Sequence, residues 1–422
     1  MRAHFAYGKT GIELDLPDQF DYKILEAKSA SPLPDQIAAL EQAMDAPIAG
    51  PSLRELASGK NSASISVCDI TRPAPNKLVL PPLLKRLHAA GIPREKVTIL
   101  IATGLHRLAT KPELDEILSP EIAATYRVVN HNARIISDHR YLGETKAGTP
   151  VYVAEDFVAA DLHITLGFIE PHLMAGFSGA RKLVAPGLAA QETIKVLHSP
   201  KFMRDPRAVE GSIDGNTLHR ELLEIAQMAG HHFMVDVTLT RDRQIAGVFA
   251  GEPVQAHKAG MKFVSEVMLE QLPAPVDGVI TSCAGYPLDM TFYQAIKGIT
   301  AAQHIVKPGG RILLVAECKE GPGAAEFCRL LKMTDSGAAY LDLIQDSPVE
   351  VDQWQLEKLA LVTRKAELFF YTPGLPEEFY KTIWGTVFRS KEDAIRAFAD
   401  GLPPGATVAL APEGPYVLAK AA

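Results

Sequence analysis

Short runs of aliphatic and β-branched residues recur along the chain between polar or glycine-rich turns, a pattern typical of buried β-strands. Residues 64–67, 97–101 and 162–166 are such runs. Between the first two lies a helical pattern at residues 77–90, which ends at a Gly-Ile-Pro sequence. The order strand, helix, strand predicts a parallel α/β unit.

The remaining pattern extends this architecture along the chain. It predicts a hairpin from residues 3–5 and 11–16, a helix at 218–229, and strands at 311–316 and 367–371. After Gln271 a proline-rich stretch leads into a further apolar strand, which marks a domain boundary. We therefore predict two α/β domains with mainly parallel sheets, residues 1–271 and 272–422, with an active-site cleft between them.

Length and composition narrow the class of protein. A chain of 422 residues is too long for one ordinary core, in keeping with two domains. Its formal charge of -7 argues against nucleic acid or an anionic membrane as the main partner. No apolar run approaches the roughly 18 residues of a spanning helix. We see no secretory signal and no CxxC spacing among the four cysteines, so we expect a cytoplasmic protein with reduced thiols.

Ionisable and polar side chains follow four of the predicted strands. In open α/β sheets, ligands bind beyond the carboxyl ends of the strands. The residues at these positions are Asp69 and Arg72 after the first strand, His106 after the second, His172 and Lys182 after the third, and Tyr293, Gln294 and Lys297 after the strand that follows Gln271. Their recurrence at strand ends predicts a shared binding or catalytic site.

Each of these residues also has an ordinary structural interpretation. Arg72 could bind a carboxylate through its two-pronged guanidinium, or form an ion pair with Asp69. His106 and His172 could be acid/base groups that titrate near neutrality, or hydrogen-bonded structural histidines. Lys182, in apolar surroundings, could have a lowered pKa and act as a nucleophile, or be solvated. Taken one at a time, the residues leave these alternatives open.

Familiar cofactor motifs do not account for the pattern. Residues 176–182 (GFSGARK) lack the spacing of a phosphate-binding loop, and no Ser or Thr follows the lysine. Residues 307–315 predict only a generic turn into a buried strand, which is not specific to any cofactor. No GxGxxG follows a predicted strand, which disfavours a nicotinamide dehydrogenase, and no zinc-binding pattern occurs.

In order and spacing, these residues resemble the nickel-dependent lactate racemase family over nearly the whole chain. The resemblance implies that Lys182 in SGARKLVAPG carries a covalently linked nickel-pincer nucleotide, pyridinium-3-thioamide-5-thiocarboxylic acid mononucleotide. It implies that His198 in VLHSP is the protein ligand of the nickel, beside two sulfurs and a carbon of the cofactor. Such a square-planar set with soft donors suits Ni(II). His106 in TGLHR and His172 in GFIEPH match the two catalytic histidines of the family.

The resemblance extends to the residues around the reacting centre. Asp69 and Arg72 in CDITRPAP match a segment that helps bind cofactor and substrate, and Tyr293, Gln294 and Lys297 in FYQAIKG match a substrate-side helix. Arg72 and Lys297 would fix the substrate carboxylate and polarise the keto oxygen. We also expect the backbone amides near Ser178 and Gly179 to cradle the cofactor phosphate as an anion nest does.

The implied activity is that of an isomerase, a racemase or epimerase of 2-hydroxy acids that works by reversible hydride transfer. Its partners would be a small 2-hydroxy acid and the proteins that make the cofactor. Lactate, malate, an aromatic hydroxy acid and a sugar acid all remain open as substrates, with Trp354 or Trp384 as a possible pocket residue. A non-catalytic carboxylate- or metal-binding protein also remains open. The oligomeric state and the enantiomer that each histidine serves do not follow from the sequence.

Overall fold

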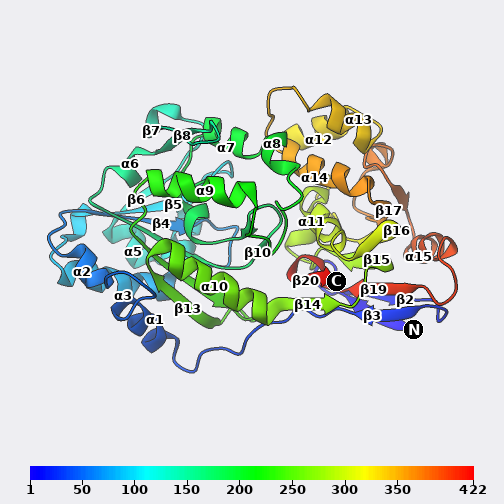
Figure 1. The fold of residues 1–422 in the computed structure, drawn as a ribbon, viewed down its shortest axis with the longest axis horizontal. Helices are drawn as coiled ribbons and strands as arrows, with labels where there is room; N and C mark the ends of the chain where they lie inside the picture. Colours follow the sequence, from blue (N-terminus) through cyan, green and yellow to red (C-terminus); the bar gives the residue numbers. More distant parts are fainter. The chain divides into compact units, whose positions relative to one another are not determined.

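Two six-stranded sheets organise the computed structural model, which describes residues 1–422 (Figure 1). The chain divides into two compact units. We call residues 29–197 and 205–267 the central unit, and residues 1–28, 198–204 and 268–422 the terminal unit. The prediction of an α/β protein with mainly parallel sheets is confirmed.

The central unit is built on a sheet whose strands are, in spatial order, β13 (Ile245–Gly251), β12 (Phe233–Leu239), β9 (Leu162–Phe168), β4 (Ala63–Cys68), β5 (Val97–Ala102) and β6 (Arg127–Asn130). All neighbours are parallel except β12 and β13. Every residue of β4 is buried, as expected for a parallel strand covered on both faces.

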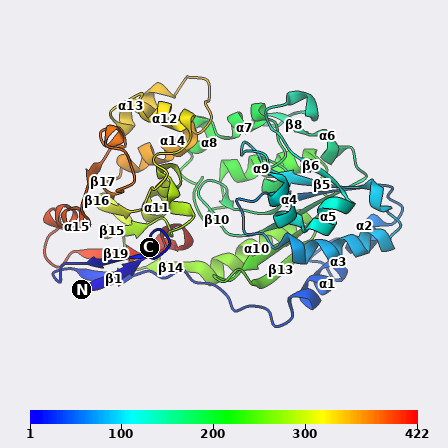
Figure 2. The same cartoon turned by 180° about the vertical axis from the view of Figure 1, so that it is seen from behind.

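Helices cover both faces of the central sheet. Figure 1 shows α9 (Thr217–Met228) and α10 (Pro253–Met268) on one face, and Figure 2 shows α3 (Asn76–Ala89), α4 (Lys111–Leu118) and α5 (Pro120–Thr125) on the other. The unit also contains α1 (Gln36–Asp45), α2 (Leu53–Ala57), α6 (Glu155–Val158), α7 (Gln191–Leu197), the hairpin β7 (His139–Glu144)–β8 (Pro150–Ala154) and the short hairpin β10 (Pro171–His172)–β11 (Gly176–Phe177).

The terminal unit has a sheet of strands in the order β18 (Thr386–Phe388), β17 (Ala366–Tyr371), β16 (Val306–Val315), β15 (Val276–Ser282), β19 (Thr407–Ala411) and β3 (Asp21–Ile24), all parallel. Its helices are α8 (Pro200–Met203), α11 (Phe292–Ala302), α12 (Ala325–Leu331), α13 (Gly337–Leu343), α14 (Gln353–Thr363) and α15 (Lys391–Asp400). Two further strand pairs are the hairpin β1 (Arg2–Phe5)–β2 (Ile12–Asp15) and parallel β14 (Leu269–Leu272)–β20 (Leu418–Ala421).

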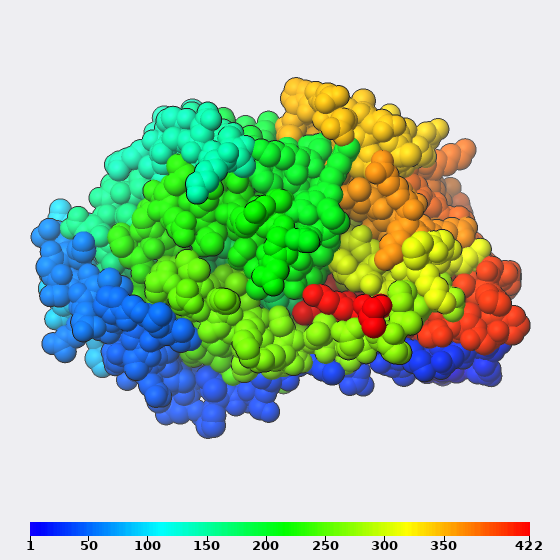
Figure 3. Space-filling view, in the orientation of Figure 1, coloured from blue at the N-terminus to red at the C-terminus, as the bar shows by residue number.

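The units differ from the expected domains at residues 1–28, 198–204 and 268–271, which the sequence pattern had assigned to the first domain. Residues 1–28 join the terminal unit because β3 forms the edge of its sheet beside β19. In Figure 3 these first residues (blue) accordingly border residues near the C-terminus (red). Residues 198–204 join it through contacts with α14, described below.

The predicted elements correspond closely to those observed. The hairpin at the N-terminus, the helices now labelled α3 and α9, and the strands β4, β5, β9, β16 and β17 all lie where the pattern indicated, within a few residues at their ends. The parallel pairing of β4 with β5 is also confirmed. None of the helices combines the length and apolar composition that crossing a bilayer requires.

Candidate active site

The carboxyl ends of β4, β5 and β9 lie side by side, because these strands are parallel neighbours in the central sheet. The loops that follow them therefore leave the sheet at one edge. These loops carry the five candidate residues of the central unit, Asp69, Arg72, His106, His172 and Lys182. The expectation that they gather at a strand-end edge is met by the topology of this sheet.

Asp69 and His106 form a hydrogen-bonded pair at this edge. The Asp69 side chain is buried, and its Oδ2 lies 2.7 Å from Nδ1 of His106, while its Oδ1 accepts a bond of 2.6 Å from the Thr71 hydroxyl. Burial by itself raises the pKa of Asp69, but the hydrogen bond and charge of His106 outweigh it and the pKa stays below its usual range. Because Nδ1–H of His106 donates a hydrogen bond to the Asp69 carboxylate, Nε2 of the neutral ring carries no proton and is left as a base.

Of the two interpretations of Arg72, an ion pair with Asp69 is not observed. Its guanidinium forms no ion pair with that carboxylate, which is occupied by His106, and only the backbone amide of Arg72 bonds to the Asp69 carbonyl, at 3.2 Å. The charge of Arg72 acts on both neighbours: it contributes to the lowered pKa of Asp69 and helps to lower the pKa of Lys182. A guanidinium without a carboxylate partner, near the strand-end edge, suits the binding of an anionic ligand.

His172 is oriented by the backbone of its own hairpin. It ends β10, and its Nδ1 accepts hydrogen bonds from the amides of Met174, at 3.3 Å, and Ala175, at 3.2 Å. A ring nitrogen that accepts hydrogen bonds from two amides is unprotonated, so the neutral ring carries its proton on Nε2. His106 and His172 therefore have different tautomers: Nε2 is unprotonated and can act as a base in His106, whereas it carries the proton and can donate in His172.

Lys182 lies in a one-turn 3-10 helix, Ala180–Leu183, that follows Gly179. Gly179 has a φ of 84° and Ala180 a φ of 41°, so the backbone enters this turn through two left-handed residues. Burial, followed by the charges of Arg72 and Arg181, lowers the pKa of Lys182 to about 7. The structure shows no hydrogen bond or ion pair of the Lys182 amine, and the lowered pKa increases the share of its neutral form near neutral pH.

The expected phosphate cradle at Ser178 and Gly179 does not match the hydrogen bonds of these residues. The Ser178 amide donates to the carbonyl of Glu170 at 2.9 Å, and its hydroxyl donates to the carbonyl of Phe168 at 2.8 Å. The carboxyl of Asp236, from β12, lies directly against Gly179: a Cβ on Gly179 would be only 2.2 Å from its Oδ2. A carboxyl group of the protein, whose pKa burial raises to about 7, thus occupies this turn.

In the terminal unit, α11 carries Tyr293, Gln294 and Lys297. The helix begins at Thr291, whose hydroxyl caps it by accepting from the Gln294 amide. Tyr293 and Lys297 are four residues apart and share one face of the helix. The Oε1 atom of Gln294 is buried without a hydrogen-bond partner, which marks it as an acceptor for a ligand or for water.

His198 lies between α7 and α8 and packs against a residue that sequence reasoning could not place. The ring centroids of His198 and Trp354, from α14, are 4.4 Å apart with an interplanar angle of 42°. The second tryptophan, Trp384, lies elsewhere, where its Nε1 donates to the Thr334 carbonyl at 3.3 Å. Of the two tryptophans considered as pocket residues, only Trp354 thus lies beside a candidate site residue.

Comparison with known proteins places the chain in a family. Sequence models of the lactate racemase N-terminal and C-terminal domains match residues 7–211 and 271–419. The chain belongs to the lactate racemase family. It is 32% identical over 98% of both chains to the lactate racemase of Thermoanaerobacterium thermosaccharolyticum, and 34% identical over 90% of both to that of Lactiplantibacillus plantarum.

Solved structures agree with this membership. The lactate racemase apoprotein from Thermoanaerobacterium thermosaccharolyticum superposes with a TM-score of 0.93 at 31% identity, covering 100% of both chains. A protein from Thermotoga maritima superposes with a TM-score of 0.67 at 17% identity over 93% of this chain and 100% of its own, which shows a shared fold.

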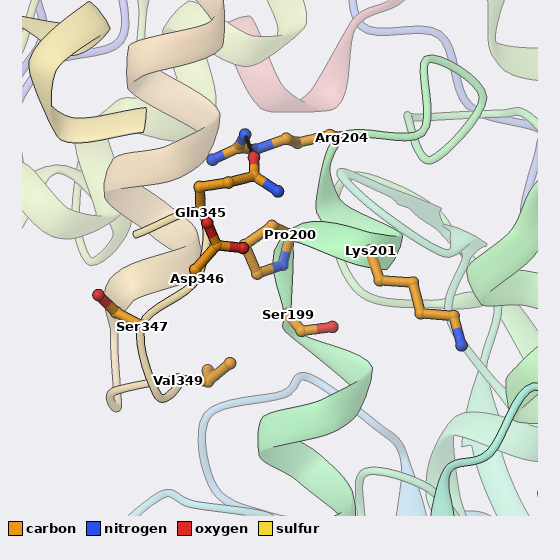
Figure 4. Close-up of a pocket in the computed structure, with 8 residues that line it drawn as sticks. All are labelled: Ser199, Pro200, Lys201, Arg204, Gln345, Asp346, Ser347 and Val349. Carbon is orange, nitrogen blue, oxygen red and sulfur yellow. Dashed lines mark hydrogen bonds between the residues drawn. The ribbon is translucent and has the colours of Figure 1, made fainter. Parts of the chain in front are cut away.

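The segment that carries His198 is anchored on α14 by charged groups. Nε of Arg204 lies 2.8 Å from Oε1 of Glu357, whose side chain is fully buried, and Nζ of Lys358 donates to the carbonyl of Met203 at 2.9 Å. Figure 4 shows Arg204 beside Gln345, to which it also donates a hydrogen bond. The surrounding cavity of about 430 Å³ is lined by Ser199, Pro200, Lys201, Arg204, Gln345, Asp346, Ser347 and Val349.

The residues of the central unit fit the attachment of a cofactor to Lys182. Acylation needs a neutral amine, and the Lys182 amine has both a lowered pKa and no partner to release. Close packing of the backbone around it depends on glycine, since a Cβ on Gly187 would lie 2.8 Å from the Leu183 carbonyl oxygen. No group of three or more His, Cys, Asp and Glu side chains is gathered for a metal.

Proposed function

We propose that the protein is a racemase of 2-hydroxy acids, with lactate as the first substrate to test, that uses a nickel-pincer nucleotide tethered to Lys182. Membership of the lactate racemase family supports the reaction class. The observation that carries the mechanism is the unpartnered Lys182 amine, with a pKa lowered to about 7, in a loop at the same sheet edge as the Asp69–His106 pair.

Two residues would hold the cofactor. Lys182 would form the covalent amide-type link, and His198 would supply the one protein ligand of the nickel. When bound, the group supplies an acceptor for the hydride that leaves C2 of the substrate. An amine with a pKa near 7 is about half neutral at pH 7, against roughly three in ten thousand for an ordinary lysine, which favours its acylation. The link also removes a charge that Arg72 and Arg181 repel.

Binding of the substrate would fall to Arg72 and to residues of α11. Arg72 takes the carboxylate through its forked guanidinium, because it has no other anion to bind. Lys297 and Tyr293, on one face of α11, hold the oxygen at C2, where negative charge develops as the hydroxyl proton leaves. Gln294 offers its unpaired Oε1 as an acceptor for a substrate hydroxyl or a bridging water.

Proton transfer falls to His106 and His172. Nε2 of His106 takes the hydroxyl proton, and the Asp69 carboxylate at Nδ1 stabilises the imidazolium that forms. His172 presents Nε2–H to the oxygen of the keto intermediate. To act as the base for the other enantiomer, His172 must release the two amide contacts at Nδ1, so the two histidines enter the cycle in different states.

The side chain of the substrate would lie near Trp354. This ring packs on His198, so if His198 binds the nickel, Trp354 borders the reacting centre. A large indole there leaves room for a small substituent such as the methyl group of lactate. The second candidate is the same chemistry on malate, an aromatic hydroxy acid or a sugar acid. The space beside Trp354 would decide between lactate and these larger substrates.

The test is a racemisation assay with protein made alongside a working cofactor pathway. Loaded protein is incubated with each enantiomer of lactate, malate, an aromatic 2-hydroxy acid and a sugar acid, and loss of optical rotation is followed. We expect racemisation of at least one acid, highest for lactate, and its loss in His106→Asn and His172→Asn. Loaded protein that binds a 2-hydroxy acid without racemising any of them would favour the non-catalytic binding protein.

A further inference from the structure

Arg181, next to the tether lysine, is a buried arginine without a carboxylate partner. Its side chain is 1% exposed, its Nε has no hydrogen-bond partner, and the charge of Asp236 acts on it without a salt bridge. Removing a guanidinium from water is costly unless its N–H groups are satisfied. Burial lowers the pKa of Arg181 to about 9, which reflects this cost. The hydrogen-bond partners of Arg181 indicate why a guanidinium is buried at this position.

The hydrogen bonds of Arg181 lead to the hairpin that carries His172. Nη2 donates to the carbonyls of Ala175, at 2.8 Å, and Phe177, at 3.2 Å. Ala175 is also one of the two residues whose amide donates to Nδ1 of His172, at 3.2 Å. Arg181 thus holds Ala175 by its carbonyl, and the amide of Ala175 orients His172.

The other side of the guanidinium is held by α10. Nη1 of Arg181 lies 3.2 Å from Nδ1 of His257, a buried histidine whose Nε2 lies 2.7 Å from the Ser178 carbonyl. Since Nε2 faces a carbonyl, it carries the proton, and Nδ1 accepts from Arg181. Asp236 fixes the same turn by accepting from the Ala180 amide at 2.8 Å. The backbone just before Lys182 is therefore fixed from β12 through Asp236, independently of Arg181, and from α10 through His257, which also contacts Arg181.

We propose that Arg181 is a positioning residue that holds the His172 imidazole in a set place and tautomer relative to Lys182. The inference rests on the proposed function for the roles of His172 and Lys182, but its contacts do not. A guanidinium suits this task because its donors diverge in one plane and reach the hairpin and α10 together. A lysine would reach one of these partners, and a methionine of similar length would reach neither.

The direct test is the tautomer of His172 in protein without cofactor, read from ¹⁵N chemical shifts of histidine-labelled samples and assigned with His172→Asn. The wild type should show the Nε2–H form of His172. Arg181→Met should shift this signal toward the Nδ1–H form or an average, and Arg181→Lys should lie between. Arg86→Met is the matched control, because Arg86 is also a buried arginine of the central unit but bonds to Asp45.

Kinetics of loaded protein give the second readout. At equal cofactor content, we expect kcat of Arg181→Met to fall about 10- to 100-fold, because a misplaced catalytic group costs rates of that order, with KM within about threefold. Arg181→Lys should recover part of the loss. Arg86→Met should keep the wild-type kcat even if its melting temperature falls.

Several results overturn the proposal. An unchanged His172 signal in Arg181→Met is one, and an equal loss of kcat in Arg86→Met and Arg181→Met, which would mean general destabilisation, is another. If Arg181→Met cannot be purified folded, an unchanged His172 signal in Arg181→Lys overturns it equally. A wild type that takes up no cofactor would defeat the proposed function alone, since the tautomer is measured without cofactor.

Discussion

Replacing Asp69 with asparagine isolates the contribution of the buried carboxylate to His106. The substitution keeps the shape of the side chain but removes the charge that bonds to Nδ1 at 2.7 Å. A hydrogen bond to a charged group contributes about 1.5–3 kcal/mol. The His106 side chain is 51% exposed, so solvent screens the pair, and we take about 1–2 kcal/mol. At 1.36 kcal/mol for each factor of ten, kcat/KM should fall about 5- to 30-fold.

The assay is racemisation in both directions, normalised to the fraction of Lys182 that carries the cofactor. Enantiomers have equal free energies, so kcat/KM must fall by the same factor in both directions. Thr71→Val is the control, because it removes the bond to the other oxygen of Asp69 and leaves the charge and the His106 contact. We expect that variant to stay within about threefold of the wild type. If Asp69→Asn retains kcat/KM within twofold at equal loading, the pairing has no catalytic role and the reasoning is refuted.

Three further predictions concern stability and specificity. Burial lowers the pKa of His131 to about 3 and that of His257 well below its usual value, so both are neutral when folded and take up protons near pH 6.5 when unfolded. The contribution of these two histidines to folding stability is therefore fully present above that pH and is lost as the pH drops, by about 1.4 kcal/mol for each histidine at pH 5.5. Urea midpoints at pH 7.5 and 5.5 measure this loss, and equal midpoints would contradict it. Trp354→Ala should raise kcat/KM for an aromatic 2-hydroxy acid relative to lactate while Trp384→Ala leaves the ratio unchanged; the opposite ranking would move the pocket away from Trp354. Glu357→Gln leaves Arg204 without its buried partner and should lower the free energy of unfolding by about 2 kcal/mol, less than for a fully buried pair because Arg204 is partly exposed; an unchanged denaturation midpoint would argue against the anchor.

The strands that position the central site were readable from the sequence because each is buried on both faces. β4, β5 and β9 appear as short apolar runs, and their parallel order follows from the helix between them. β12 escaped the same reasoning, since Asp236 interrupts its apolar run. The placement of β3 escaped it too, because pairing with β19 joins opposite ends of the chain, and no local pattern encodes such a contact.

The site residues show the same division. Motif order alone led to Lys182 and the histidines, and the apolar residues around Lys182 made a lowered pKa one of two alternatives, the one that the structure favours. Hydrogen-bond partners were not accessible. The nest at Gly179 is filled by Asp236, 56 residues away from the amide of Ala180 that it accepts from, so the phosphate cradle could not be judged from its local sequence. Trp354 likewise became a candidate only through its packing on His198.

The different tautomers of the two histidines come from one distant and one local set of contacts. His106 is set by a carboxylate that follows a different strand, and His172 by amides of its own hairpin turn. Both histidines look alike in sequence, as single imidazoles after buried strands. A tautomer is decided by the partner at the second nitrogen, so it can be derived only once the loops are placed.

The central claim is that Lys182 carries a nickel-bearing cofactor, and one measurement tests it most directly. Protein produced with a working cofactor pathway is digested and analysed by mass spectrometry together with its nickel content, with Lys182→Arg as the control. We predict a covalent adduct on the Lys182 peptide, close to one nickel for each modified chain, and neither in the control. An unmodified Lys182 without nickel, from cells in which the pathway loads a known lactate racemase, would contradict the account.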